Sequence, residues 1–177
     1  MGEHATAVQA RLRELLAERR PDREWHTEYS VAGTPVDVAG TPTDVAETPT
    51  DMAGTPTDAA DTDADSLVLV ELEWRRADPA NNTAKLFREL VETDPGSAND
   101  TVHILQLFSR YYDLASGGVS TKRRNAAFVG ERVAETVQTA TYTAVTLDID
   151  PPKRGGDLPE DWTDATDEAT SRVADLV

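Results

Sequence analysis

Five tandem blocks of seven residues lead directly into the most hydrophobic stretch of the chain. The blocks run from Val31 to Asp65 and read VAGTPVD, VAGTPTD, VAETPTD, MAGTPTD and AADTDAD. The stretch that follows, SLVLVELEW from Ser66 to Trp74, alternates in side-chain direction, so that Glu71 and Glu73 share one side with two leucines. We therefore expect a low-complexity tract followed by a β-strand that ends in two acids.

Most of the repeat tract is expected to loop out of the fold. Residues 39–65 form an acidic heptapeptide-repeat insertion with few large apolar side chains, which predicts disorder. Loop length costs only about 0.6 kcal/mol per doubling, so a deletion of Thr41 to Thr62 is predicted to preserve folding. Because every block carries Asp at the same phase, four residues compete for a place in the strand before the insertion: Asp37, Asp44, Asp51 and Asp58. Asp37 is favoured because its neighbours Val36 and Val38 can be buried in a sheet.

The remaining pattern predicts alternating strands and helices within one domain, residues 1–177. A helix is expected from Glu3 to Arg20, and a strand from Trp25 to Val31 with Trp25, Thr27, Tyr29 and Val31 on one face. The later elements are a helix ending near Asp94, a strand at Val102 to Ser109, a helix starting at Ser120 or Thr121, a strand within Thr139 to Asp150 and a helix containing Trp162 and Leu176. This order calls for an α/β fold with a mixed central sheet flanked by helices.

Composition narrows the class of protein. The chain has 33 acidic and 17 basic residues, a net charge of -16, and an arginine-rich basic set, which is typical of a halophilic protein with a solvated acidic surface. It has no cysteine, which excludes disulfides and thiolate metal sites. No apolar stretch approaches the roughly 18 residues of a membrane span, and no signal-peptide core is present. We expect a soluble cytoplasmic protein without a membrane partner.

The element order, together with Asp37 and the triplet Glu71-Leu72-Glu73, resembles the PD-(D/E)XK, or restriction-endonuclease-like, nuclease superfamily. The resemblance covers Glu3 to Ser109, and its most specific part is the phrase VELEWRRADPANNTAKLFREL. It implies an αβββαβ core, with the repeat loop inserted in the hairpin of the second and third strands. It also implies that an Asp on the second strand and an acidic triplet on the third form the active site.

This resemblance implies a site for a divalent metal, Mg²⁺ or Mn²⁺, held by Asp37, Glu71 and Glu73. Residues two apart on a strand lie about 7 Å apart at their Cα atoms, and their side chains can converge with an acid from the neighbouring strand. Glu73 stands where the family usually has Lys; a minority of relatives carry Glu there as a metal ligand or general base. Lys85 on the following helix could reach back as a catalytic lysine. The assignment fails if Asp37 points into solvent while both glutamates pair with arginines.

Basic residues after the third strand are candidates for DNA binding, and a homodimer is expected from the resemblance because dimerisation is common in that superfamily. The candidate DNA ligands are Arg75, Arg76, Arg88, Lys122, Arg123 and Arg124. Three functions remain open. The first is a metal-dependent DNA endonuclease of restriction, repair or mobile-element type, which hydrolyses phosphodiester bonds. The second is a catalytically inactive nuclease-fold module that binds DNA or protein, and the third is an acidic interaction protein such as an antitoxin or adaptor.

Overall fold

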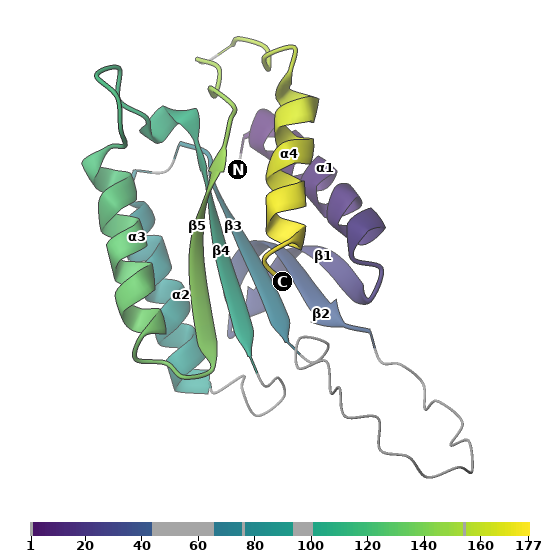
Figure 1. Ribbon diagram of the computed structural model, residues 1–177, viewed down its shortest axis with the longest axis vertical. Coiled ribbons are helices and arrows are strands. Elements are labelled where there is room, and N and C mark those ends of the chain that lie inside the picture. The colour runs from purple at the N-terminus through teal and green to yellow at the C-terminus, as the bar shows by residue number, and fades with distance from the viewer. Residues whose placement is uncertain (1, 44–65, 76, 94–100, 154) are drawn as a thin grey trace.

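A five-stranded mixed sheet forms the centre of the molecule (Figure 1). The computed structural model describes residues 2–43, 66–75, 77–93, 101–153 and 155–177. The strands lie in chain order: β1 (Arg23–Val31), β2 (Thr34–Pro42), β3 (Leu67–Glu73), β4 (Val102–Ser109) and β5 (Ala140–Leu147). β2 is antiparallel to both of its neighbours, whereas β3, β4 and β5 are parallel.

Helices cover both faces of the sheet, which confirms the predicted α/β layering. The helices α1 (Glu3–Arg19) and α4 (Trp162–Ala174) pack on one face, and α2 (Pro79–Thr93) and α3 (Thr121–Ala134) pack on the other (Figure 1). A short 3-10 helix, η2 (Arg110–Tyr112), follows β4. None of the helices within the described residues is long and apolar enough to cross a membrane.

The strand β3 divides the core in two. All of its residues are buried, with Val68, Val70 and Leu72 in the cluster under α1 and α4, and Leu67 and Leu69 in the cluster under α2 and α3. By the same alternation Glu71 and Glu73 point toward the α2 and α3 side. The predicted alternation of this strand is therefore confirmed.

The hairpin of β1 and β2 changes faces partway along. Its two-residue turn, Ala32-Gly33, has φ values of 49° and 85°, as a type I′ turn requires. Glu28 also has a positive φ of 51°, and it lies where the Cα pairing between the two strands is interrupted. Trp25 consequently packs in the cluster under α1, whereas Tyr29 packs against the opposite cluster. The prediction of one shared face from Trp25 to Val31 was wrong, because the left-handed backbone at Glu28 rotates the strand.

The sheet includes the second repeat block as far as Pro42, so the predicted start of the insertion at residue 39 was too early. Ala39 and Gly40 are buried within β2, and Thr41 and Pro42 pair with β1. Small residues permit this, because the indole of Trp25 lies directly against Gly40. The remaining tract, residues 44–65, lies outside the described residues. The predicted deletion from Thr41 to Thr62 would therefore remove the end of β2.

Both stems of the repeat tract are held by the start of β1. The Thr43 amide and hydroxyl donate to the Asp22 carbonyl, the hydroxyl at 2.9 Å. On the other stem, the guanidinium of Arg23 donates to the Ser66 carbonyl and, at 2.8 Å, to its hydroxyl oxygen. Arg23 is only 4% exposed, so these bonds form inside the protein. These bonds fix the end of β2 and the start of β3.

Candidate active site

The strands β2 and β3 part just where the predicted acids stand. Their pairing consists of Val38 with Val70 and the next two pairs toward Gly40, and it ends there. Continued by one residue, this register would place Asp37 opposite Glu71, the position of closest approach between neighbouring strands. The gap between the two strands at this point, which we call the fork, therefore lies between two acids, both of them buried.

The Asp37 carboxylate turns toward β3 and not into solvent. Its Oδ2 accepts a hydrogen bond from the Leu72 amide at 2.6 Å, which replaces the backbone acceptor that a continued ladder would supply. Asp37 is 4% exposed and Glu71 is 7% exposed. The fork thus holds two carboxylates in a largely desolvated place, where ionised groups are costly unless they bind donors or a cation.

The helix α1 fixes the fork from one side. Gln9 is 3% exposed, and its Nε2 donates to the Asp37 carbonyl at 2.5 Å and to Glu28 Oε1 at 3.0 Å. One side chain therefore ties the rotated part of β1 to the Asp37 backbone. Sequence reasoning missed both Gln9 and Glu28, because a glutamine among helical leucines and an acid in an alternating strand are both ordinary.

The fork also shows which repeat aspartate takes the strand position. Val36 and Val38 on either side of Asp37 are fully buried. A shift by one block would put Thr43 in the place of Val36 and Glu47 in the place of Gly40, where even a Cβ atom would lie 2.9 Å from the Trp25 ring. Asp37 occupies the position, as predicted from its valines. The alternatives Asp44, Asp51 and Asp58 lie outside the described residues.

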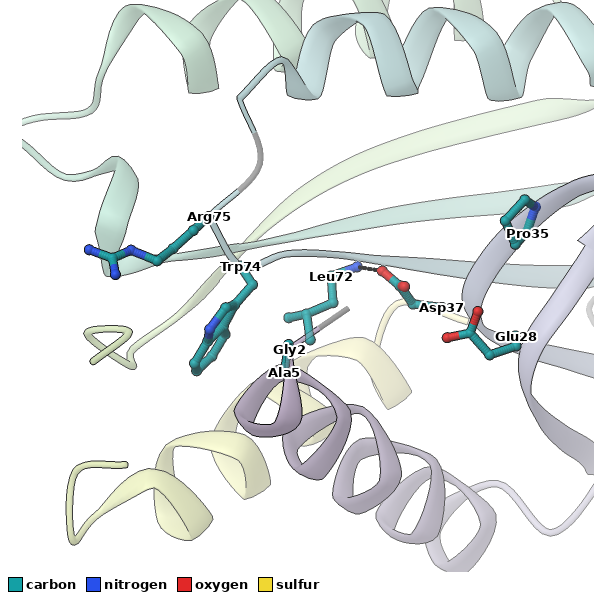
Figure 2. Close-up of a pocket in the computed structure, with 8 residues that line it drawn as sticks. All are labelled: Gly2, Ala5, Glu28, Pro35, Asp37, Leu72, Trp74 and Arg75. Atoms are coloured by element: carbon teal, nitrogen blue, oxygen red, sulfur yellow. Dashed lines mark hydrogen bonds between the residues drawn. The ribbon is translucent and has the colours of Figure 1, made fainter. Parts of the chain in front are cut away.

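A hollow of about 420 Å³ opens beside Asp37 on the α1 side (Figure 2). Its lining combines two carboxylates, one aromatic side chain and one guanidinium with small and apolar groups: Gly2, Ala5, Glu28, Pro35, Asp37, Leu72, Trp74 and Arg75. Figure 2 shows Glu28 and Asp37 together toward one end and Trp74 toward the other, with Leu72 between them. The hollow joins the fork to the surface.

Glu73 lies apart from this hollow, in a buried polar cluster on the α2 and α3 side. It is 0% exposed, and Gln106 Nε2 donates to its Oε1 at 2.8 Å. The Gln106 carbonyl oxygen lies 2.6 Å from the Tyr142 hydroxyl and 3.1 Å from the Thr83 hydroxyl. Burial raises the pKa of Tyr142, and the charges of Glu131 and Glu73 raise it further. Sequence reasoning missed Gln106, because the strand VHILQLFS was interpreted only by its apolar residues.

The predicted cluster of three carboxylates is not assembled in the described part of the chain, where no group of three or more His, Asp or Glu side chains is placed to hold a metal ion. A metal site with only two protein carboxylates needs fewer donors. Mg²⁺ is commonly bound through one or two carboxylates, with water and substrate phosphate completing its octahedral shell. Asp37 and Glu71, which the continued register would place opposite each other on β2 and β3, are the two candidates for that smaller donor set. Glu73, held by Gln106, is not needed for it.

No family model, curated protein or solved structure matches this chain.

The predicted DNA ligands on the α2 and α3 helices are mostly at the surface. Lys122 and Arg124 are exposed in the first turn of α3, whose N-cap Ser120 accepts a hydrogen bond from the Arg123 amide. Arg123 itself is largely engaged: it lies 5.1 Å from the centre of the Phe108 ring, donates to Thr146 at 2.7 Å, and has its pKa lowered by burial. Arg123 therefore supports the fold at this corner, whereas Lys122 and Arg124 are accessible to a ligand.

The other basic candidates differ in their distance from the fork. Lys85 and Arg88 are exposed on α2, and Arg88 donates to Glu89 at 2.6 Å. Arg75 lines the hollow, donates to the Pro152 carbonyl at 2.9 Å and lies 5.1 Å from the centre of the Tyr111 ring. Arg76 lies outside the described residues. A catalytic role for Lys85, DNA binding and dimerisation stay predictions.

Proposed function

We propose that the protein is a divalent-metal-dependent DNA endonuclease that hydrolyses phosphodiester bonds at the fork between β2 and β3. The observation that carries the proposal is the pair of buried carboxylates, Asp37 and Glu71, placed at the point where two neighbouring strands part. The order α1-β1-β2-β3-α2-β4 also agrees with the αβββαβ core of the PD-(D/E)XK superfamily, in which acids of the second and third strands form the active site.

Asp37 and Glu71 would hold Mg²⁺ or Mn²⁺ in this function. A bound ion lowers the pKa of a water ligand and stabilises negative charge that develops on the phosphate. Other groups of the protein position Asp37 and supply a contact for the phosphate. The Leu72 amide fixes one oxygen of Asp37, Gln9 fixes the Asp37 backbone, and Arg75 offers a guanidinium at the hollow for a phosphate oxygen.

Glu73 is assigned a supporting role in this proposal. Its complete burial and its hydrogen bond from Gln106 support a function in fixing β3 against β4, and not a direct contact with substrate. Because Glu73 stands where the family usually has Lys, the metal that Asp37 and Glu71 would hold would supply the activation of water.

The same burial of Glu73 favours a second candidate function, a nuclease-fold module that binds DNA or a protein without cutting. Glu73 stands where the family usually has the positively charged Lys, and Lys85, the predicted substitute for that lysine, is exposed on α2. In this second function Asp37 and Glu71 would serve only to shape the fork.

Plasmid cleavage distinguishes the two functions. Wild-type protein is incubated with supercoiled plasmid in concentrated KCl, with Mg²⁺, Mn²⁺ or EDTA, beside Asp37→Asn, Glu71→Gln and the matched control Glu24→Gln, an exposed carboxylate on β1. We expect metal-dependent nicking by wild type and Glu24→Gln, and a loss of about 100-fold or more in the two fork variants. Retarded but uncut DNA would select the binding module. Cleavage that persists in both fork variants would overturn the site.

A further inference from the structure

The hollow beside Asp37 has the size and the lining of a site for a flat, polar ring. Its volume of about 420 Å³ falls in the range of small-molecule pockets. The indole of Trp74 and the apolar groups Leu72 and Pro35 supply surfaces for stacking, and the Glu28 and Asp37 carboxylates supply hydrogen-bond acceptors (Figure 2). Two acceptors toward one end of a hollow and an aromatic ring toward the other match a ligand that carries N–H donors on the edge of a planar ring.

Glu28 is presented to the hollow by an unusual backbone. A φ of 51° is uncommon for a residue other than glycine, and such conformations cluster at ligand sites because the surrounding structure must maintain them. Here the surrounding structure is α1, from which Gln9 donates to Glu28 Oε1 at 3.0 Å. One oxygen of Glu28 is thereby fixed, and the carboxylate is held in place before any ligand arrives.

Arg75 extends the stacking surface beyond the hollow. Its guanidinium lies over the Tyr111 ring and is anchored by the Pro152 carbonyl. Tyr111 is 41% exposed, although a large aromatic side chain is usually more deeply buried. The hollow is thus lined by an indole and by a guanidinium that in turn lies over a phenol ring. Aromatic planes with interleaved arginine are the general means by which proteins bind single-stranded nucleic acid.

We infer that the hollow holds one unpaired nucleobase, so that the nucleic acid is single-stranded or locally opened at the fork. This inference rests on the proposed function and names the substrate class of the same site. The base stacks on Trp74, and its exocyclic amine donates to Glu28, in the way that carboxylates accept from cytosine N4. A base within a duplex already uses these donors for pairing and cannot enter a hollow of this size without leaving the stack.

Binding without metal tests this inference separately from cleavage. The full chain is titrated in EDTA and fixed KCl with a fluorescein-labelled single-stranded 12-mer and with its duplex, and anisotropy is recorded. The variants are Trp74→Ala, Trp74→Phe, Glu28→Gln and the control Glu24→Gln. We expect the single strand to bind at least about tenfold more tightly than the duplex. Loss of the stacking plane in Trp74→Ala should weaken the single strand roughly 5- to 150-fold, with most of the affinity restored in Trp74→Phe.

Glu28→Gln gives a second reading that does not depend on the fold of the Trp74 variants. Because cytosine offers an amine and thymine does not, the variant should lose more affinity for oligo-dC than for oligo-dT. Equal affinity for duplex and single strand, or wild-type binding by both Trp74→Ala and Glu28→Gln, would overturn the inference. Plasmid cleavage that is lost in Asp37→Asn would still stand in that case. Conversely, single-strand binding without any cleavage would support a nucleobase site in the hollow and would reject the endonuclease function.

Discussion

Gly40→Ala is the change that tests most directly how the repeat tract is anchored in the sheet. A Cβ at Gly40 would lie 2.9 Å from two atoms of the Trp25 ring, whereas ordinary contacts begin at 3.4 Å. Trp25 cannot move aside easily, because it is 3% exposed and its Nε1 donates to the Arg20 carbonyl at 3.0 Å. One of the two strands must therefore shift by about half an ångström.

The expected loss of stability follows from two opposing terms. Overpacking a well-filled core by one methyl group costs about 1–3 kcal/mol. Replacing glycine by alanine returns about 0.4–1 kcal/mol, because the unfolded chain has fewer conformations. The net destabilisation is at most about 2.6 kcal/mol and about 1.3 kcal/mol at the middle of both ranges, which for a domain of this size lowers the melting temperature by roughly 3–5 °C at the middle value and about 10 °C at most. Thermal unfolding followed by circular dichroism in one KCl buffer measures it.

Gly54→Ala is the matched control, because Gly54 has the same place two blocks later in the repeat. β2 ends at Pro42, so this change should alter stability by no more than about 0.5 kcal/mol. The reasoning is refuted if both single variants are silent while the double variant is destabilised. That result would mean that β2 can shift by two blocks and use either glycine, with Asp51 in the place of Asp37.

Two further predictions concern the polar cluster and the tract. Tyr142→Phe removes the hydroxyl near Gln106 and should lower the free energy of unfolding by about 0.5–1.5 kcal/mol at neutral pH. Because burial raises the pKa of Tyr142, the stability that the protonated hydroxyl contributes is fully present below the unfolded pKa near 10 and is lost as the pH rises above it. The stability of the variant should therefore fall less steeply than that of wild type in melts from pH 9 to 11. Deletion of residues 45–65, three whole blocks, should leave the melting temperature within a few degrees of wild type. A deletion of residues 41–62 should unfold the end of β2, and equal melting of the two deletions would contradict the assigned stems.

The sheet could be predicted from the sequence because its central strands are buried on both faces. β3 and β4 are short and nearly continuous in apolar residues, and such runs between helical patterns have few other interpretations. The bounds of β4 were predicted to the residue. The hairpin was harder, since its change of face depends on the backbone of Glu28, a residue whose type gives no sign of a left-handed conformation.

The candidate site was predictable only in part, for a related reason. Asp37 could be chosen among four equivalent aspartates because valines mark the strand that carries it. The grouping of Glu73 with Gln106 and Tyr142 depends on the side chains that β4 and β5 place beside the end of β3. Sequence spacing alone predicted that both glutamates would lie at the metal site. The side chains of β4 and β5 instead hold Glu73 in a separate buried cluster.

Each repeat block contains an aspartate, but the turn and strand contacts that position Asp37 are made by the first two blocks. In the first block Ala32-Gly33 forms the tight turn, and in the second the same dipeptide, Ala39-Gly40, lies in a strand against Trp25. These two uses require the blocks to follow each other directly, with Asp37 between them at the fork. Later copies begin after Thr43, where Asp22 and Arg23 already hold both stems. Because the cost of closing a loop grows slowly with its length, we expect the number of blocks to vary without moving Asp37.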